Sequence, residues 1–159
     1  TLPQPAGSTL WGMTDQVSPT STEADNIATV EKFLFSLRGP DLDTAGELID
    51  ENIVYQNVGF PTIRGRQRTL KVFKALDRPS FAFDVAIHRT AGDGAVVLNE
   101  RTDVLAFGPV RLQFWVCGVF EVHDGRITLW RDYFDQFDFA KAMIRGLAGA
   151  VIPALRPTL

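Results

Sequence analysis

The chain has 159 residues, of which 45% are hydrophobic and 22% are charged, a balance typical of one globular domain with a substantial core. Its formal net charge of -3 argues against nucleic-acid binding, which requires clustered excess Lys and Arg. The single cysteine, Cys117, excludes an intrachain disulfide and a metal site built from thiolates.

The organisation of the chain can be outlined from composition. No run approaches the roughly 20 apolar residues that a membrane-spanning helix needs, so we expect no membrane partner. Residues 1–12 lack the basic and apolar regions of a secretion signal, and we expect a cytoplasmic protein. Met13 would be a plausible natural start, which would make those twelve residues a possible expression remnant. We expect a flexible arm at residues 1–20, one domain over residues 21–147 and a tail at residues 148–159.

The first half of the chain has the apolar period of helices. Thr22, with Asp25 three residues later, resembles a capping box, and the helix that it opens should stop at Gly39-Pro40. The elements expected next are a helix over residues 43–49, a strand over residues 53–58 and a helix over residues 64–76.

The second half alternates or runs apolar, which predicts β-strands. His123-Asp124-Gly125-Arg126 is the clearest hairpin turn. A last helix is expected over residues 137–147, ended by Gly149 and Pro153, with Asp135 as its cap. Helices followed by antiparallel strands predict an α+β domain with helices on one face of a curved sheet. The expected strands cover residues 81–89, 95–106, 110–122 and 126–134.

Three charged side chains lie where strand alternation directs them toward an apolar layer. Arg101 and Asp103 share one face of their strand. Asp132 shares a face of the last strand with Trp130 and Phe134. Because an ionised carboxylate in an apolar layer is costly unless it is paired or protonated, this set indicates a site where protonation states are controlled.

These residues also have simpler interpretations. Arg101 and Asp103 could form a buried ion pair that only stabilises the sheet, and Asp132 could pair with its neighbour Arg131. The large apolar residues beside them are compatible with ordinary core. They line a pocket only if the sheet curves open.

The strand over residues 110–122 is apolar on both faces. Phe114 and Val116 lie on one face, whereas Trp115 and Cys117 lie on the other. A strand of this kind is usually covered twice. We therefore expect helices on one face and a second copy of the chain on the other, in a homodimer.

Four strings occur in an order and spacing that can be compared with known families. The longest, Gly125-Arg126-Ile127-Thr128-Leu129-Trp130-Arg131-Asp132-Tyr133-Phe134-Asp135, is long enough to be fairly specific. Over about residues 22–140, the chain resembles the limonene-1,2-epoxide hydrolase family. The other strings are Tyr55-Gln56-Asn57, Glu100-Arg101-Thr102-Asp103-Val104-Leu105 and Gly118-Val119-Phe120.

The resemblance implies a cone-shaped α+β fold of the nuclear-transport-factor-2-like (NTF2-like), or SnoaL-like, kind, in which N-terminal helices and a strongly curved mixed sheet enclose a deep apolar pocket. It implies hydrolysis of an apolar epoxide, cyclic or terpenoid-like such as limonene-1,2-epoxide, to a vicinal diol without a cofactor or metal ion. By motif position, the family's Asp-Arg-Asp triad corresponds to Asp103, Arg101 and Asp132. Tyr55 and Asn57 match the pair that holds the attacking water.

Elementary chemistry gives a compatible mechanism. Opening an epoxide with water needs a proton delivered to the ring oxygen while another proton leaves the water. Two carboxyl groups can do this if one is protonated and the other ionised, and one guanidinium beside both in a dry pocket favours that division. We expect Asp103 to be the acid, Asp132 the base and Arg101 the bridge between them. The expected substrate-binding side chains are Leu105, Phe114, Val116, Trp130 and Phe134.

Other chemistries find little support. The chain has no Gly-x-Ser-x-Gly elbow and no Gly-rich nucleotide loop, and His88 and His123 are far apart in sequence. Within the same fold, the alternatives are a ketosteroid-isomerase-like or polyketide-cyclase-like isomerase and a non-catalytic small-molecule-binding domain. None of these needs an arginine that bridges two aspartates, so the polar residue set favours the hydrolase.

Overall fold

The computed structural model describes residues 21–39 and 41–157, and the arm expected at residues 1–20 lies outside them. Every expected helix and strand is present, together with β2, a two-residue strand that the sequence did not predict. The helices are α1 (Ser21–Ser36), α2 (Leu42–Leu48), α3 (Arg66–Leu76) and α4 (Gln136–Val151), and a short 3₁₀ helix covers Pro153–Leu155. The strands are β1 (Ile49–Asn57), β2 (Ile63–Arg64), β3 (Phe81–Asp93), β4 (Val96–Phe107), β5 (Val110–His123) and β6 (Arg126–Tyr133).

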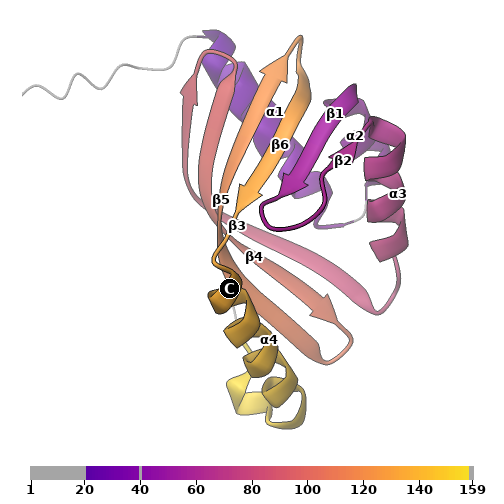
Figure 1. The fold of residues 1–159 in the computed structure, drawn as a ribbon, viewed down its shortest axis with the longest axis vertical. Helices are drawn as coiled ribbons and strands as arrows, with labels where there is room; N and C mark the ends of the chain where they lie inside the picture. The colour runs from indigo at the N-terminus through magenta and orange to yellow at the C-terminus, as the bar shows by residue number, and fades with distance from the viewer. Residues whose placement is uncertain (1–20, 40, 158–159) are drawn as a thin grey trace, which may run out of the picture.

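The described strands form one curved, mixed sheet in the order β2-β1-β6-β5-β4-β3 (Figure 1). Strands β3 to β6 are an antiparallel meander, as their turn chemistry predicts. β1 comes from the helical half of the chain and pairs in parallel with β6. This pairing places Tyr55 opposite Trp130 and Asn57 opposite Asp132, so residues far apart in sequence meet at one place in the sheet.

Helix α1 covers one face of the sheet, behind β5 and β6 in the view of Figure 1. Its apolar positions Val30, Phe33 and Leu34 are fully buried, in one cluster with Phe120 and Ile127 of the sheet. Burial of each such side chain contributes about 1.5–3 kcal/mol. The apolar residues at helical spacing therefore hold α1 on the sheet. The part of the concave face that α1 does not cover lines the cavity described below.

The end of α4 differs from the expectation. Gly149 was expected to end the helix, but the helix continues to Val151 and Gly149 lies buried inside it. A Cβ at Gly149 would lie 3.3 Å from the Cα of Arg156, and Arg156 Nε donates to the Gly149 carbonyl at 3.0 Å. This glycine therefore serves close packing, and the helix stops just before Pro153.

The other end of α4 is as predicted. Asp135 is its N-cap and accepts hydrogen bonds from the backbone N–H groups of Phe137 and Asp138. No helix among the described residues is long and apolar enough to cross a membrane.

Candidate active site

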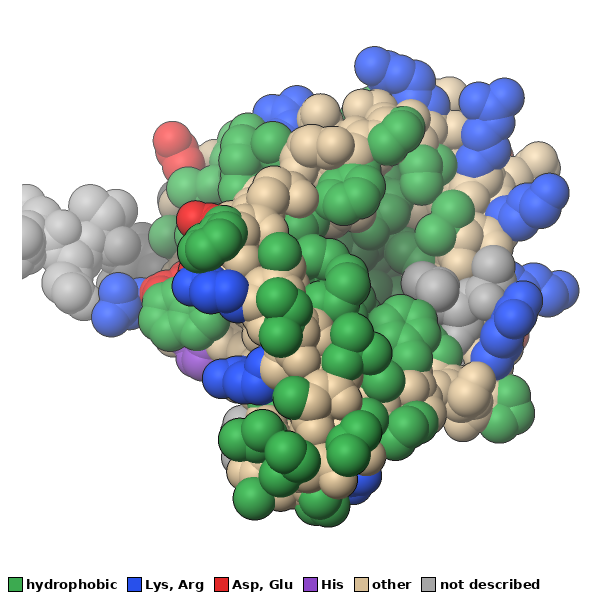
Figure 2. Space-filling model, turned by 60° about the horizontal axis from the view of Figure 1, so that its bottom comes forward, with side chains coloured by type: hydrophobic (Ala, Val, Ile, Leu, Met, Phe, Trp, Pro, Cys, Tyr) green, Lys and Arg blue, Asp and Glu red, His purple; other side chains and the backbone are tan. Residues whose placement is uncertain are grey.

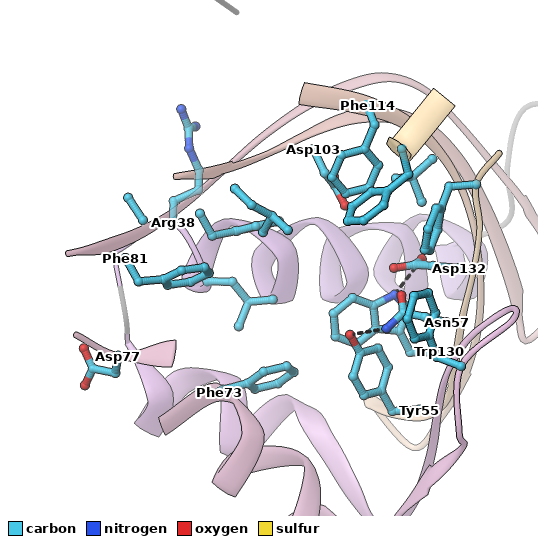
Figure 3. A pocket seen from close by; sticks show the side chains of 18 of the residues that line it. Arg38, Tyr55, Asn57, Phe73, Asp77, Phe81, Asp103, Phe114, Trp130 and Asp132 are labelled. Carbon is cyan, nitrogen blue, oxygen red and sulfur yellow. Dashed lines mark hydrogen bonds between the residues drawn. The ribbon is translucent and has the colours of Figure 1, made fainter. Parts of the chain in front are cut away.

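A cavity of about 650 Å³ lies between the concave face of the sheet and the helices. Figure 2 shows a hollow lined by hydrophobic side chains on this side of the molecule. Asp103, Asp132, Tyr55 and Asn57 converge at one end of it, away from Arg38 and Asp77 on the other side (Figure 3). The apolar wall includes all five residues expected to bind substrate, namely Leu105, Phe114, Val116, Trp130 and Phe134.

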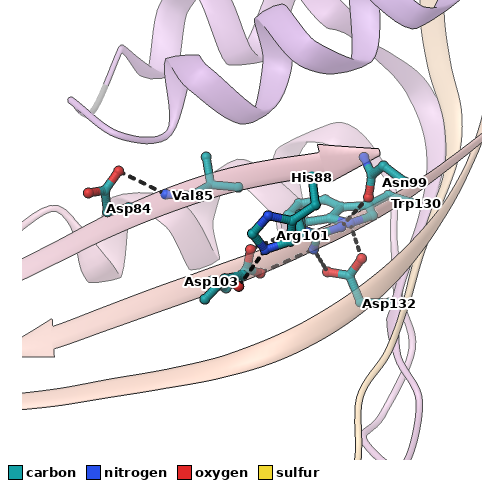
Figure 4. Close-up of polar contacts among 9 residues, drawn as sticks. Asp84, Val85, His88, Asn99, Arg101, Asp103, Trp130 and Asp132 are labelled. Carbon is teal, nitrogen blue, oxygen red and sulfur yellow. Dashed lines mark hydrogen bonds and ion pairs between the residues drawn. The ribbon is translucent and has the colours of Figure 1, made fainter. Parts of the chain in front are cut away.

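Arg101 lies behind the two carboxylates and is fully buried. Its Nε donates to Asp103 Oδ1 at 2.9 Å, and its Nη2 donates to Asp103 Oδ2 at 3.2 Å (Figure 4). The same Nη2 donates to Asp132 Oδ2 at 2.6 Å. One guanidinium nitrogen thus joins both aspartates, which is the bridge that the sequence predicted.

Glycine in the middle strand makes this bridge possible. Arg101 is on β4 and Asp132 is on β6, so the guanidinium must cross β5. Gly118 of β5 pairs with Asn99 on one side and with Asp132 on the other. A Cβ on Gly118 would overlap the guanidinium and would lie 2.7 Å from Asn99 Oδ1. The role of Gly118 was missed, although a glycine inside an apolar strand often marks a close approach.

Trp130 has a second role that strand alternation does not reveal. Besides lining the pocket, its indole Nε1 donates to Asp132 Oδ1 at 2.8 Å. Asp132 is therefore held at one oxygen by Trp130 and at the other by Arg101. Its expected alternative partner, Arg131, instead donates through Nε to Gln56 Oε1 at 2.9 Å, so that interpretation of Asp132 is wrong.

Tyr55 and Asn57 form a pair on β1 beside Asp132. Asn57 Nδ2 donates to the Tyr55 hydroxyl at 2.7 Å. This leaves the Asn57 carbonyl oxygen as an acceptor and the Tyr55 hydroxyl hydrogen as a donor. Burial, together with the charge of Asp132, raises the pKa of Tyr55, so its hydroxyl keeps its proton.

The protonation states of Asp103 and Arg101 depend on their burial and on the charges beside them. Burial, with a smaller contribution from Asp132, raises the pKa of Asp103 to about 6 against the opposing effect of Arg101. Burial alone would favour loss of the Arg101 proton, but Asp132 and Asp103 outweigh it and raise the pKa of Arg101. The arginine therefore stays charged, while Asp103 can hold a proton at mildly acidic pH.

Groups of three or more His, Cys, Asp or Glu residues that could hold a metal ion do not occur in the described part of the chain. His88 lies on the opposite face of the sheet from Arg101 and Asp103, where its Nε2 is 2.7 Å from Thr102 Oγ1 and its ring contacts Trp115.

The curved mixed sheet with its helices defines an NTF2-like α+β protein. A family model for the limonene-1,2-epoxide hydrolase catalytic domain matches residues 24–145. Epoxide hydrolase EphG of Mycobacterium tuberculosis (strain ATCC 25618 / H37Rv) is 53% identical over 130 residues, which cover 82% of this chain and 87% of that protein. The chain therefore belongs to the limonene-1,2-epoxide hydrolase family, and it is an epoxide hydrolase.

Solved structures agree with this assignment. The structure of an M. tuberculosis LEH-like epoxide hydrolase has a TM-score of 0.85 and 50% sequence identity, and the match covers 89% of this chain and 100% of that chain. A ketosteroid isomerase described as putative, from Kribbella flavida DSM 17836, has a TM-score of 0.60 at 20% identity, over 72% of this chain and 80% of that chain. This second likeness shows the fold alone. The isomerase alternative is therefore supported by a shared fold alone.

Proposed function

We propose that this enzyme opens an apolar epoxide in one step, with Asp132 removing a proton from water while Asp103 gives a proton to the ring oxygen. The observation that carries this proposal is that Arg101 Nη2 donates to both carboxylates at the polar end of an apolar pocket. A single positive charge cannot fully compensate two negative charges in such a place, which favours one shared proton.

We assign the shared proton to Asp103. Its pKa is raised to about 6, chiefly by burial, and it faces the pocket. A general acid has to be protonated when the reaction begins. We therefore expect kcat/KM to fall as the pH rises through about 6.

The attacking water would be held by three groups. It donates one hydrogen to Asp132 and the other to the free carbonyl oxygen of Asn57, and it accepts a hydrogen bond from the Tyr55 hydroxyl. The remaining lone pair then points at a ring carbon, and such positioning contributes strongly to rate.

Atoms balance without a covalent enzyme intermediate. The oxygen of water bonds to one ring carbon as that carbon loses its bond to the epoxide oxygen. Asp132 gains the proton of the water and Asp103 gives its own proton to the alkoxide. The site is restored when the proton returns from Asp132 to Asp103.

The pocket wall favours cyclic or terpenoid-like epoxides such as limonene-1,2-epoxide over small polar ones. Aromatic rings dominate the wall next to the carboxylates, and Phe114 contacts Phe134 and Phe139 with ring centroids 5.5 and 5.0 Å apart. Each aromatic ring offers a large apolar surface to a ligand.

This substrate class can be tested with purified enzyme, limonene-1,2-epoxide and glycidol, measuring diol by gas chromatography. We expect kcat/KM for limonene-1,2-epoxide to exceed that for glycidol by at least about a hundredfold, since several buried methylene groups distinguish them. The Asp132→Asn variant should lose about 10²–10⁴ in kcat while remaining folded. Equal preference for glycidol would refute the substrate class, and a fully active Asp132→Asn enzyme would refute the mechanism.

A homodimer is proposed from the outer face of the sheet. Trp115 is 65% exposed there, and Leu98 and Tyr133 on neighbouring strands are 48% and 44% exposed. Such an apolar face is suited to a second copy of the chain. Size-exclusion chromatography with light scattering should give a dimer for the wild type and a monomer for Trp115→Glu. A monomeric wild type would contradict the proposal.

We also propose that residues 21–147 are the catalytic domain and that it works in the cytoplasm without a cofactor. The single cysteine, exposed on β5, is compatible with a reducing compartment.

A further inference from the structure

Asn99 is a buried polar residue to which the proposed reaction gives no role. It lies on β4, on the same face as Arg101 and Val97, and is only 5% exposed. Its Nδ2 has no hydrogen-bond partner among the described residues. An unpaired buried donor costs free energy that an apolar side chain would not, so its presence needs a compensating interaction.

The compensating interaction is with Arg101. Asn99 Oδ1 accepts a hydrogen bond from Arg101 Nη1 at 3.0 Å. The other edge of the guanidinium, Nε and Nη2, serves Asp103 and Asp132. Figure 4 shows Asn99 and Asp103 on opposite sides of the guanidinium.

Only one orientation of the Asn99 side-chain amide allows a hydrogen bond with Arg101 Nη1. If it were flipped, Nδ2 would face Nη1 and two donors would oppose each other. The carbonyl oxygen therefore points at the arginine, and the unpaired Nδ2 is the consequence. Gly118 lies against the same contact, because a Cβ there would lie 2.7 Å from Asn99 Oδ1.

We propose that Asn99 is a positioning residue that holds the Nη1 side of Arg101 with a neutral acceptor, so that one cation is shared by two carboxylates and no more. This inference rests on the proposed function. A leucine at this position would leave Nη1 unpaired in the core, and the guanidinium would lose one of its fixed points. An aspartate would add a third carboxylate to the same cation and would make the pair hold its proton more tightly.

The charged and titratable groups around the pair come from three strands and from α1, where Glu31 accepts a hydrogen bond from Thr90, the residue opposite Asn99 on β3. Arg101 is on the same strand as Asp103, Asp132 is on β6, and Tyr55 is on β1. The residues directly opposite Asp103 are Val85 on β3 and Phe114 on β5, which do not titrate. Because the side chain at position 99 contacts the same guanidinium as Asp103 and Asp132, a new charge there should change how tightly the two aspartates hold their shared proton.

Asn99→Leu and Asn99→Asp test the proposal, with Asn26→Leu as a matched control. Asn26 is likewise a buried amide, 7% exposed, and neither it nor Asn99 lines the pocket, but its Nδ2 donates to the Gly94 carbonyl, whereas Asn99 accepts from Arg101. Each variant is assayed for kcat, KM and the pH profile of kcat/KM with limonene-1,2-epoxide, and its thermal midpoint is measured.

We expect Asn99→Leu to lower kcat by about tenfold or more with KM changed less than about threefold, and Asn26→Leu to keep the wild-type kcat. Asn99→Asp should move the alkaline limb of the pH profile upward by roughly one pH unit. The inference is overturned if Asn99→Leu keeps the wild-type kcat and pH profile, or if Asn26→Leu loses kcat in parallel with it.

An Asp132→Asn arm in the same assay separates this inference from the proposed function. If Asp132→Asn is inactive while Asn99→Leu is normal, only the role of Asn99 fails. If Asp132→Asn is active, the acid/base mechanism fails and the inference fails with it.

Discussion

Arg101 carries a planar, forked guanidinium, which no other cationic side chain provides. Its planar fork presents Nε and Nη2 to Asp103 and still directs Nη2 to Asp132. A lysine ammonium is a compact point charge and cannot form the same side-on pair. The proposed proton sharing therefore depends on the geometry of the cation as well as on its charge.

Arg101→Lys should lower kcat by about a hundredfold or more, because the ammonium cannot hold both carboxylates in place. Arg131→Lys is the matched control, since Arg131 is half-buried and bonds Gln56 on the adjacent strand. Steady-state kinetics with limonene-1,2-epoxide would measure both. Wild-type kinetics for Arg101→Lys would contradict the bridging role.

Gly118→Ala should affect both stability and rate. The added methyl group would overlap the Arg101 guanidinium and crowd Asn99, so we expect a loss of about 1–3 kcal/mol in the free energy of unfolding together with reduced kcat. Gly39→Ala is a suitable control because a Cβ at Gly39 meets nothing within 4 Å. Urea unfolding and diol formation are the measurements. A Gly118→Ala enzyme as stable and active as wild type would show that this close approach is unimportant.

At the scale of elements, the sequence predicts every α-helix and every strand except β2, but not how they are brought together. The period of α1, the Asp-Gly turn before β6 and the cap at Asp135 are local signals, and the structure confirms all three. The parallel pairing of β1 with β6 joins segments far apart in sequence, so no local pattern reveals it. The same holds for β2, which exists only because it pairs with β1.

The features of the candidate site likewise fall into those that the sequence predicts and those that it does not. Strand alternation alone indicates Arg101, Asp103 and Asp132, whereas Tyr55 and Asn57 are predicted only by the resemblance. The crossing at Gly118 depends on neighbours from other strands, so it can be found only once the strands are in register. The indole hydrogen bond joins Trp130 and Asp132 within β6, and it depends on side-chain orientations that the alternation of a strand does not fix.

The cap of α4 gives a test at this scale. Asp135→Ala removes the acceptor for the Phe137 and Asp138 backbone N–H groups and should lower the thermal midpoint, because those donors lose their partner. Since Asp135 lies outside the pocket wall, kcat should be nearly unchanged. Circular dichroism melts and kinetics would measure both. An unchanged midpoint would show that the cap is dispensable.

For the whole molecule, the buried acid links activity to stability. The pKa of Asp103 is raised from 3.8 to about 6, so the folded protein binds a proton there more tightly than the unfolded chain does. The stability that this proton provides is full below about pH 4 and is lost as the pH rises through about 6.

Asp103→Asn should remove this dependence. Relative to the variant, the wild type should lose up to about 3 kcal/mol in its free energy of unfolding between pH 4 and pH 7. Urea unfolding of both proteins across this range measures the difference, in which the contributions of groups far from Asp103 cancel. A difference that does not change with pH would show that Asp103 titrates at its ordinary pKa.

The central claim is direct attack of water on the epoxide, and a single turnover in oxygen-18 water tests it. Enzyme in excess over limonene-1,2-epoxide is mixed in labelled water, the reaction is stopped after one turnover, and diol and protein are examined by mass spectrometry. Direct attack predicts one oxygen-18 atom in the diol and none in the protein. An unlabelled diol, with oxygen-18 in the carboxylate of Asp132 or Asp103, would contradict the account.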